Sequence, residues 1–586
     1  MSKLKPIFIL LLIIASLTFR ACAPTSPAPA PATQETSTPA QTSAPTPTPT
    51  LTPVSTPKII PTPTPSTKIT PAEFKVTSLV VTPIVTEPGK PVTVEVKVTN
   101  AGGTAGSTSL ALTVNGKEEA FKDVTVTHGK TETTTFALTK DASGIYEIKV
   151  AGFTETLRVR EPGTYPRLAN LYAGVDAFYW KAQQFTPSQV DSMLKLLARW
   201  DIVAVDANVA WFAPDYLRKL KKLNPRVKIL AVIGAGAGGY WRWMLTDGLE
   251  APNRPGWITP EVVSFVRKQA EYYGITAQDS NESFFLHYGN TPGNSKPPEQ
   301  RRWILWTSEV RSGDDWPGMN PNSDWSTYLP HLVKDKLMST GLFDGVWYDC
   351  FLETMWAPNL DIDNDGIGDS LNFVNQKYRE GMTRLLQITR ELLGPDAIII
   401  GNPGSEWSAN SPFFNYANGH IQECALGIQS WSNRDFAKVW EVYERNMQTP
   451  APPSRINWID ADTNNVKYDP FDTNLPPTEL QKMRYGLSIA LLDDGYYGFD
   501  IGNEFHNTIW WFPEYDANLG LAKGKAQKRT DGTWIREFQN GVVVVNPAGS
   551  TSTIKFNTIY QDVTTGIKGI SFTVQPQDGR IFLKSG

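Results

Sequence analysis

Eight short apolar segments alternate with helical segments between residues 165 and 505, and this alternation restricts the fold more than any other feature of the chain. Each segment is rich in Val, Ile and aromatic residues, which is typical of strands buried inside a parallel sheet. Eight such strands joined by helices predict a (β/α)8 TIM barrel. The segments are residues 168–172, 202–206, 229–233, 345–349, 398–401, 421–424, 456–459 and 496–500.

The segments between these strands have the features of helices. Thr186-Pro187-Ser188-Gln189 is a capping box with Pro at the first helical position. Residues 478–492 form another long helical pattern. The interval from Gly234 to Asp344 is too long for one crossover, so it predicts an insertion rich in loops.

The fourth predicted strand ends abruptly in a carboxylate. Residues 343–353 read F-D-G-V-W-Y-D-C-F-L-E, so Asp349 follows the run Val346-Trp347-Tyr348. In a barrel of this kind the carboxyl ends of the strands form the reaction face. Asp349 is therefore the primary catalytic candidate, with a structural acid bonded to loop amides as the alternative.

The sixth predicted strand ends in a second carboxylate, Glu423, in the stretch H-I-Q-E-C. Two carboxylates facing one cleft are what glycosidic bond cleavage requires. One stays ionised as nucleophile or base, and the other holds a proton for the leaving oxygen. Asp349 is predicted for the first role and Glu423 for the second, with Glu406 and Asp500 as the main rivals of Glu423.

Further polar and aromatic residues lie close to strand ends and are candidates for binding a substrate. A sugar site needs hydrogen-bonding groups that do no chemistry, and flat Trp faces suit sugar rings. For any single Trp of the 19 in the chain, packing in a core is the alternative. The predicted substrate-binding residues are Asp206, Trp347, Glu353, Asn402, Glu406, Trp407, Asp460 and Asp500, and Glu504, Trp431, Trp458 and Trp511 lie near them.

An acidic loop follows the fourth strand and resembles the start of an EF-hand calcium loop. Oxygen ligands alternate along it and Gly366 stands at the sixth position. The twelfth position is Asn372 instead of Glu, so the motif is incomplete. We expect a structural Ca²⁺, with a solvated acidic turn as the alternative. The expected ligands are Asp361, Asp363, Asp365, Ile367 and Asp369.

The N-terminus has the features of an export signal followed by a stalk. Lys3 and Lys5 precede an apolar run, and Ala21-Cys22 resembles the lipobox of bacterial lipoproteins, although Arg20 departs from it. Residues 1–22 are thus predicted to be a signal, with lipidation at Cys22 or a plain signal peptide. Residues 23–72 are almost all Pro, Thr, Ser and Ala, which predicts an extended stalk without a core.

Two further regions alternate with period two. In residues 73–161, Val92, Val94, Val96 and Val98 share one face, which predicts an Ig-like β-sandwich. Residues 506–586 predict a small antiparallel β-domain with a turn at Asn540-Gly541.

Composition excludes several classes of function. The net charge is -4, which argues against a nucleic-acid partner. Three cysteines and five histidines give neither a disulfide framework nor a zinc motif. Residues 234–239 fit G-x-G-x-x-G, but they follow the third strand and lack the acidic residue of a nucleotide site. No organic cofactor is expected, and Cys350 and Cys424 are predicted to face the barrel wall.

Four stretches carry a resemblance to a known family. They are F-D-G-V-W-Y-D, M-N-P-N-S-D-W at 319–325, D-D-G-Y-Y-G-F-D at 493–500 and W-I-R-E-F-Q-N-G-V-V-V-V-N-P at 534–547. Residues 165–586 resemble bacterial glycoside hydrolases of the "hypothetical glycosyl hydrolase" type, relatives of the α-amylase and α-galactosidase-like barrels. The resemblance implies a nucleophile at Asp349 and an acid/base at Glu423. Residues 73–161, with V-K-V-T-N-A-G-G-T-A-G, resemble adhesion-related Ig-like modules of bacterial surface proteins.

These observations predict a monomeric glycoside hydrolase that acts on an extracellular polysaccharide or oligosaccharide. Its only membrane attachment would be a lipid anchor at Cys22. A non-catalytic carbohydrate binder on the same barrel is the alternative. A metal-dependent deacetylase is disfavoured because His is scarce.

Overall fold

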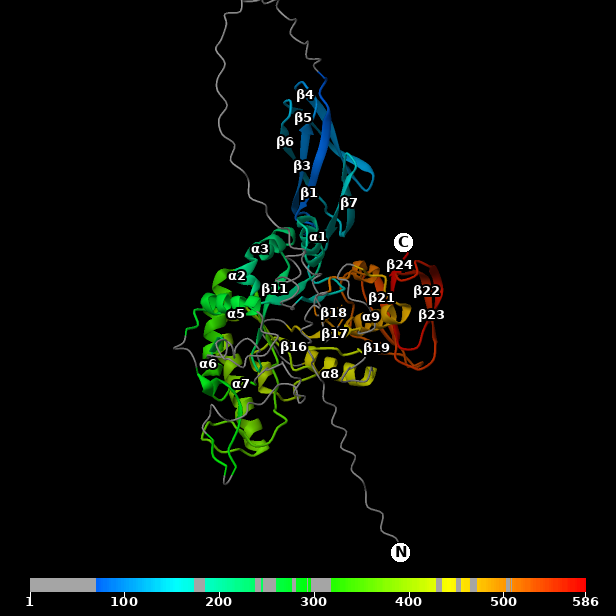
Figure 1. Cartoon of the computed structure of the whole chain (residues 1–586). Coiled ribbons are helices and arrows are strands. Elements are labelled where there is room, and N and C mark those ends of the chain that lie inside the picture. Colours follow the sequence, from blue (N-terminus) through cyan, green and yellow to red (C-terminus); the bar gives the residue numbers. More distant parts are fainter. Residues whose placement is uncertain are drawn as a thin grey trace, which may run out of the picture.

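The computed structural model describes residues 70–172, 185–237, 244–245, 260–276, 281–291, 294–296, 318–427, 435–448, 455–463, 472–501, 506 and 508–585. The predicted signal and nearly all of the predicted stalk lie outside these residues. Within the described ranges, no helix is both long and apolar enough to cross a membrane. Figure 1 shows a β-sandwich in blue, a central barrel and a β-domain in red beside it.

The N-terminal sandwich consists of a three-stranded sheet, β1-β3-β6, and a five-stranded sheet, β2-β8-β7-β4-β5. Val92, Val94, Val96 and Val98 are buried between the sheets, as the alternation in the sequence predicts. The strands are β1 Phe74–Thr82, β2 Val85–Thr86, β3 Pro91–Asn100, β4 Gly106–Val114, β5 Lys117–Val126, β6 Thr131–Thr139, β7 Gly144–Val150 and β8 Phe153–Val159.

The central sheet contains eight parallel strands in the order β18-β17-β16-β15-β13-β11-β10-β9. A parallel bridge between Leu168 and Tyr497 joins its first and last strands, so the sheet curves back on itself. The eight predicted segments supply these strands. The strands are β9 Ala169–Tyr172, β10 Ile202–Asp206, β11 Lys228–Gly234, β13 Gly345–Asp349, β15 Ile398–Gly401, β16 Gly419–Gln422, β17 Trp458–Asp462 and β18 Tyr496–Asp500.

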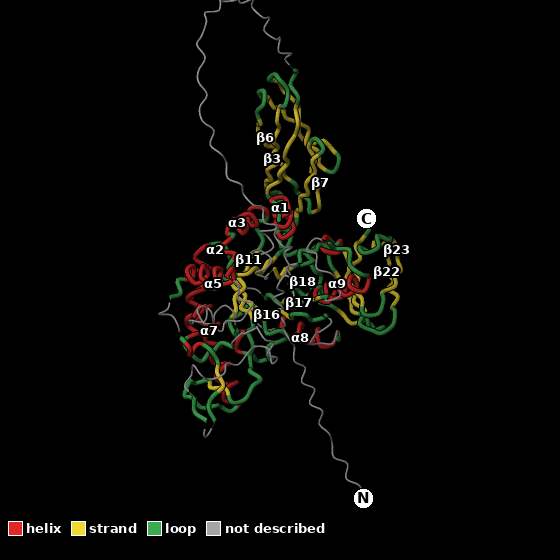
Figure 2. Tube along the Cα trace, in the orientation of Figure 1, coloured by secondary structure: helices red, strands yellow, loops and turns green. Residues whose placement is uncertain are grey.

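Helices cover the outside of the barrel sheet, as Figure 2 shows in red. The predicted capping box is present at α1, where Thr186 accepts from the Gln189 amide and the Gln189 side chain accepts from the Thr186 amide. The α-helices are α1 Pro187–Leu197, α2 Val209–Phe212, α3 Pro214–Leu223, α5 Pro260–Tyr273, α6 Trp325–Leu332, α7 Leu371–Leu393, α8 Phe436–Gln448 and α9 Pro477–Ala490.

The helical layer departs from a complete (β/α)8 arrangement. Between β15 and β16, where every residue is described, the chain forms only the short 3-10 helix η8, Pro412–Asn415. This segment has two buried Phe side chains, Phe413 and Phe414, which pack against Trp407. Aromatic packing thus covers the sheet where a helix was expected.

In its described residues, the insertion between β11 and β13 contains the helices α5 and α6. It also contributes β12, His287–Tyr288, which pairs antiparallel with β14, Leu360–Asp361. The acidic loop that follows β14 is therefore tied to the insertion.

The C-terminal domain is one antiparallel sheet in the order β19-β20-β21-β24-β22-β23. It packs on α9, where Arg484 forms a bidentate ion pair with Asp578 at 3.2 and 3.1 Å. The strands are β19 Gln527–Lys528, β20 Trp534–Glu537, β21 Gly541–Asn546, β22 Ser552–Asp562, β23 Lys568–Val574 and β24 Asp578–Lys584.

Candidate active site

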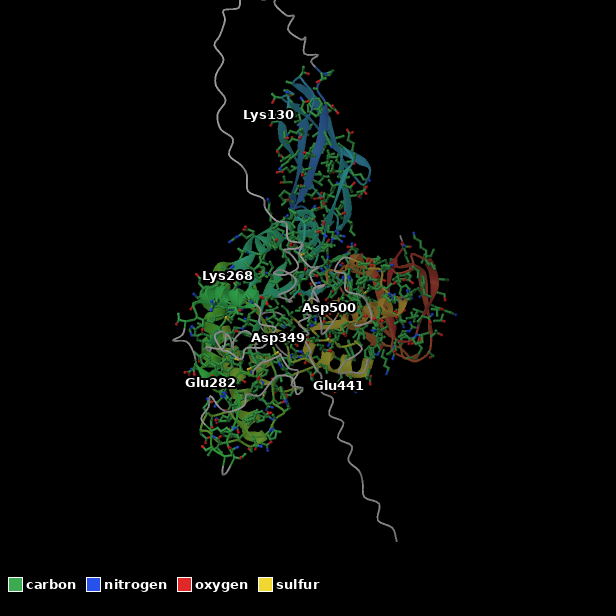
Figure 3. All side chains as sticks on the ribbon, viewed as in Figure 1. Lys130, Lys268, Glu282, Asp349, Glu441 and Asp500 are labelled. Carbon is green, nitrogen blue, oxygen red and sulfur yellow. The ribbon has the colours of Figure 1, made fainter. Side chains whose placement is uncertain are left out.

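Strand alternation places a ring of polar side chains at the carboxyl end of the barrel. In β13, Val346 and Tyr348 pack outward, whereas Trp347 belongs to the apolar cluster inside the barrel. Asp349 therefore faces inward, and Figure 3 shows it near the centre of the molecule. The same alternation applied to the other strands gives the inward set, which we call the mouth residues: Asp206, Asp349, Asn402, Glu423, Asp460, Asp462 and Asp500.

A single side-chain amide joins the two predicted catalytic carboxylates. Asn402 Nδ2 donates to Asp349 Oδ1 at 2.9 Å and to Glu423 Oε2 at 3.1 Å. The two oxygens are therefore separated by no more than about 6 Å, the sum of these distances. The fold thus brings together Asp349 and Glu423, which are far apart in the sequence.

A histidine that the sequence analysis did not consider connects Glu423 to Asp500. His506 Nε2 lies 3.0 Å from Glu423 Oε1, and His506 Nδ1 lies 2.7 Å from Asp500 Oδ2. His506 is buried, like both carboxylates. It follows β18 by only six residues, so a search for polar residues just beyond strand ends would have found it.

Burial and mutual repulsion raise the pKa of several mouth carboxyls. Burial and the charge of Glu423 raise the pKa of Asp349 to about 6. Burial raises the pKa of Asp206 to about 7, and burial with the charge of Asp500 raises that of Asp462 to about 7. Burial also raises the pKa of Asp460 well above its usual value, with a further contribution from Asp500. Such perturbed groups gathered at one place are typical of functional sites.

The backbone turns sharply after each predicted catalytic residue. Cys350 has φ 54° and Cys424 has φ 51°, in the left-handed region that non-glycine residues rarely adopt. Both thiols are buried. Close packing also explains the glycine at position 236 after β11, because a Cβ there would lie 1.9 Å from the Cys350 carbonyl oxygen. Strained backbone of this kind clusters at active sites.

Two predicted sugar-stacking residues are core residues instead. Trp347 is stacked on Trp458 inside the barrel, with ring centroids 6.4 Å apart. Trp407 is 0% exposed and packs against Phe351 and Phe413. Neither ring can present a face to a sugar, so the prediction was wrong for both. Large aromatic side chains close to the mouth fill the barrel and its wall.

Two predicted substrate-binding acids are engaged in structural contacts. Glu353 accepts from the Ser408 amide at 2.7 Å and hydroxyl at 2.8 Å, and Arg379 Nε lies 3.2 Å from it. Glu406 pairs with Arg445 on α8. These contacts hold loops together, so substrate binding is not the role that they indicate. Asp206, Asn402, Asp460 and Asp500 do lie among the mouth residues, whereas Trp431 and Glu504 lie outside the described part of the chain.

The acidic loop after β14 brings together three of its carboxylates. Oxygen atoms of Asp361, Asp363 and Asp369 lie within 4.8 Å of one another. Burial and the neighbouring carboxylates raise the pKa of Asp369. Asp365 is outside this group and accepts from the Ile367 amide at 2.7 Å. Three converging carboxylates fit the oxygen preference of Ca²⁺, although they supply only part of the predicted ligand set.

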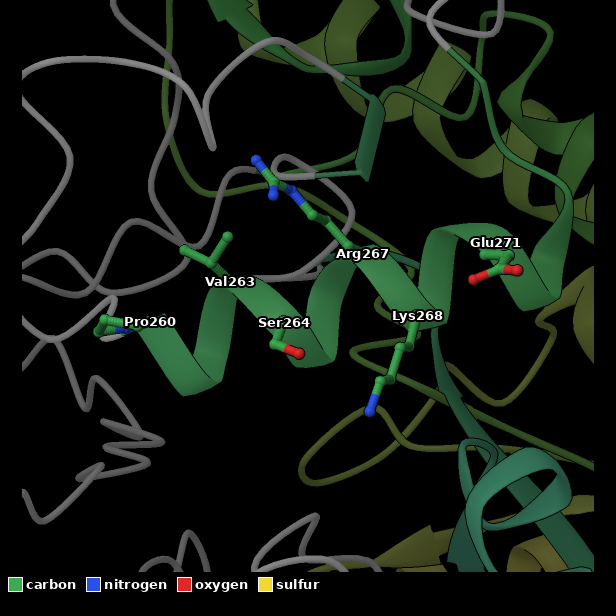
Figure 4. Close-up of a pocket in the computed structure, with 6 residues that line it drawn as sticks. All are labelled: Pro260, Val263, Ser264, Arg267, Lys268 and Glu271. Carbon is green, nitrogen blue, oxygen red and sulfur yellow. The ribbon is translucent and has the colours of Figure 1, made fainter.

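A separate cavity of about 450 Å³ lies along α5. Its lining residues are distant in sequence from both predicted catalytic residues. Figure 4 shows its side chains arranged along the helix, with Arg267 and Lys268 pointing to different sides. This cavity contains no paired carboxylates. The lining residues are Pro260, Val263, Ser264, Arg267, Lys268 and Glu271.

Comparison with family models supports both resemblances seen in the sequence. A model described as hypothetical glycosyl hydrolase family 15 matches residues 260–542, and the CARDB model matches residues 72–152. The predicted resemblance to glycoside hydrolases, and that of the Ig-like module, are thus confirmed. None of the curated proteins compared with the chain matches it.

Solved structures give only distant matches. A cycloisomaltooligosaccharide glucanotransferase from Paenibacillus sp. is 12% identical, with 88% of this chain and 70% of that chain covered and a TM-score of 0.35. A β-glucosidase from Listeria innocua in complex with glucose is 20% identical over 16% of each chain, with a TM-score of 0.14. The chain thus spans only about a sixth of that β-glucosidase. These likenesses carry no argument about the substrate.

Proposed function

We propose that this chain is a glycoside hydrolase that cleaves an extracellular polysaccharide or oligosaccharide with Asp349 and Glu423. The bridge from Asn402 to both carboxylates is the observation that carries this proposal. The match to a glycosyl hydrolase family model over residues 260–542 supports the same class of reaction.

The distance between the carboxylates favours a retaining mechanism. Retaining glycosidases hold their two carboxyl groups about 5–5.5 Å apart, whereas inverting enzymes need about 6.5–9.5 Å to admit a water molecule. Two oxygens that accept from one amide nitrogen fit the shorter spacing. Asp349 would then attack the anomeric carbon while Glu423 gives its proton to the leaving oxygen. In the second step Glu423 takes a proton from the water that releases the sugar.

The surroundings of the two carboxylates suit these two roles. With a pKa of about 6, Asp349 is ionised at neutral pH and can act as the nucleophile. Burial lowers the pKa of His506, but Asp500 and Glu423 outweigh burial and raise it well above its usual value. His506 Nε2 lies 3.0 Å from Glu423 Oε1, so a protonated imidazole is close enough to supply Glu423 with a proton. Glu423 can deliver this proton, while Asp500 fixes the other nitrogen of the imidazole ring.

The same proposal includes attachment to a cell surface and a structural Ca²⁺. A signal at residues 1–22 with a lipid at Cys22, followed by the Pro- and Thr-rich stalk, would hold the barrel away from a cell surface. A structural Ca²⁺ held by Asp361, Asp363 and Asp369 would brace the loop after β14.

The function is tested by measuring new reducing ends released from a panel of α- and β-linked polysaccharides. Asp349→Asn and Glu423→Gln should each lower hydrolysis by at least ~10³-fold, because acid–base and nucleophilic groups supply factors of this order. Glu406→Gln is the matched control, since this rival acid pairs with Arg445 at the surface and should leave the rate unchanged.

Azide rescue assigns the two roles. A glycosyl azide of inverted configuration from Asp349→Ala would identify the nucleophile, and one of retained configuration from Glu423→Ala would identify the acid/base. Full activity in Asp349→Asn would overturn the proposal. Binding of a polysaccharide without any release of reducing ends would instead support a non-catalytic carbohydrate binder.

A further inference from the structure

The barrel mouth contains more carboxylates than a retaining reaction uses. Beyond Asp349 and Glu423, the inward positions hold Asp206, Asp460, Asp462 and Asp500. Asp500 is engaged with His506, and Asp206 accepts from the Asn208 amide at 2.8 Å. The two acids of β17, Asp460 and Asp462, therefore need another explanation.

Asp460 is the most unusual of these groups. Asp460 is 1% exposed, and its Oδ2 atom has no hydrogen-bond partner in the part of the chain that the structure describes. Its other oxygen lies so close to β18 that a Cβ on Gly498 would be 2.6 Å from it. A buried carboxylate without a partner is costly, since burial removes its hydration and nothing replaces it. A buried carboxylate oxygen that faces other acids is suited to bind a positively charged group.

The charges around Asp460 are mostly of its own sign. From β17, β18 and the end of β16 it faces Asp462, Asp500 and Glu423, and the one opposing charge among its main electrostatic neighbours is His506. Atoms of Asp460, Asp500 and His506 lie within 4.8 Å of one another. His506 directs Nδ1 to Asp500 at 2.7 Å and Nε2 to Glu423 at 3.0 Å, so its ring is oriented toward those two carboxylates.

We propose that Asp460 forms a subsite for the ammonium group of a sugar unit that carries a free amine. This inference rests on the proposed glycoside hydrolase function and narrows its substrate to polymers containing amino sugars that are not N-acetylated. A neutral hydroxyl could bond to Asp460 but would bring no charge to offset the surrounding acids. A metal ion is less suited, because both His506 nitrogens are directed to carboxylates and offer it no lone pair.

Binding of an amine at this subsite should depend on pH. Burial and the neighbouring acids raise the pKa of Asp460, so a proton competes with a bound cation for its carboxyl group. An ammonium group stabilises the ionised form, and its binding therefore releases that proton. Affinity for amine-bearing sugars should rise with pH as long as the amine stays protonated, whereas affinity for neutral sugars should stay nearly constant.

The experiment measures binding by calorimetry to the full chain carrying Asp349→Asn, which prevents turnover. The probes are oligomers of glucosamine and galactosamine with free amines, their N-acetylated forms, and neutral oligomers of glucose and galactose. A charge-assisted hydrogen bond contributes about 1.5–3 kcal/mol, so the free-amine probes should bind about 10–100-fold more tightly. Adding Asp460→Asn should remove this preference, and adding Asp215→Asn, an exposed acid, should preserve it.

Three binding results and one cleavage result would overturn the inference. The first is equal or weaker binding of every free-amine probe, and the second is an undiminished preference in the Asp460→Asn variant. The third is tight binding of Mn²⁺ or Zn²⁺ that Asp460→Asn abolishes, which would assign the group to a metal. Asp349-dependent cleavage of an N-acetylated or neutral glycan would leave the proposed hydrolase intact while refuting the amine subsite.

Discussion

The barrel mouth and the junction between the sandwich and the barrel both contain charged side chains that are at least partly buried, but these charges are paired in opposite ways. At the junction, Arg158 forms a bidentate pair with Asp516 at 3.1 and 3.3 Å. Arg160 pairs with Asp201, and Arg226 pairs with Glu87. At the mouth, Asp349, Glu423, Asp460, Asp462 and Asp500 share His506 as an opposing charge. Charges that only hold domains together come with their counter-charges, whereas the excess at the mouth leaves positions for a substrate.

Cation–aromatic contacts complete the junction. The guanidinium groups of Arg158 and Arg199 each lie 5.4 Å from the ring of Trp511. Trp511 was a candidate for sugar stacking, but these arginines occupy its surroundings. Burial and the charge of Arg158 lower the pKa of Arg199 to about 10, so the Arg199 side chain remains charged at neutral pH. The contacts of Trp511 thus indicate a packing role at the junction.

The largest effect is expected at the mouth. His506→Gln should lower kcat by ~10²-fold or more, because it removes the group that shares a proton with Glu423. The pH profile of kcat/KM distinguishes this role from a structural one: the basic limb should move, and the acidic limb near pH 6 from Asp349 should stay. An unchanged profile with lower activity would mean that His506 only supports the fold.

The next effect is expected at the junction. Arg158→Met should lower the free energy of unfolding by about 2–4 kcal/mol, since it leaves Asp516 without its partner. Chemical denaturation measures this loss. Arg218→Ala is the matched control, because its pair with Asp215 is exposed and should contribute less than about 0.5 kcal/mol. Equal losses of unfolding free energy in the two variants would show that the ion pair at the junction contributes no more to stability than an exposed ion pair.

Removing an excess acid from the mouth should instead stabilise the protein. The pKa of Asp462 rises from 3.8 to about 7 on folding, so the folded state binds more protons between these values and stability falls as pH rises through that range. Asp462→Asn should therefore gain on the order of 1–3 kcal/mol at pH 8 and progressively less toward pH 4. Denaturation curves at several pH values check this. A destabilised variant at pH 8 would show that Asp462 has a compensating partner.

The smallest effect is expected at the acidic loop after β14, where the carboxylates of Asp361, Asp363 and Asp369 converge. Ca²⁺ at ten times its Kd should stabilise the chain by about 1.4 kcal/mol, and thermal unfolding with and without chelator measures this. Asp361→Asn should abolish the gain, whereas Asp215→Asn should keep it. No change on adding Ca²⁺ would identify the loop as a solvated acidic turn.

Local patterns in the sequence determined the elements and the direction of their side chains. Alternation in each short segment was enough to place Asp349 and Glu423 on inward positions at strand ends, and the capping box at Thr186 fixed the start of α1. These features depend on neighbours a few residues away, so sequence alone specifies them. The same local patterns wrongly predicted Trp347 and Trp407 as sugar-binding residues. Closeness to an acid in the sequence does not distinguish a residue at the barrel mouth from a core residue packed beside it.

Only the tertiary structure decided which of these groups meet. The barrel sheet must curve back on itself before Asn402 can bridge two strands and before His506 can reach both Asp500 and Glu423. The pairing of Arg158 with Asp516 spans 358 positions, and no local pattern specifies it. Hydrogen bonds and pKa values depend on distances and burial in three dimensions, so the chemistry of the mouth follows from the fold and not from any single segment.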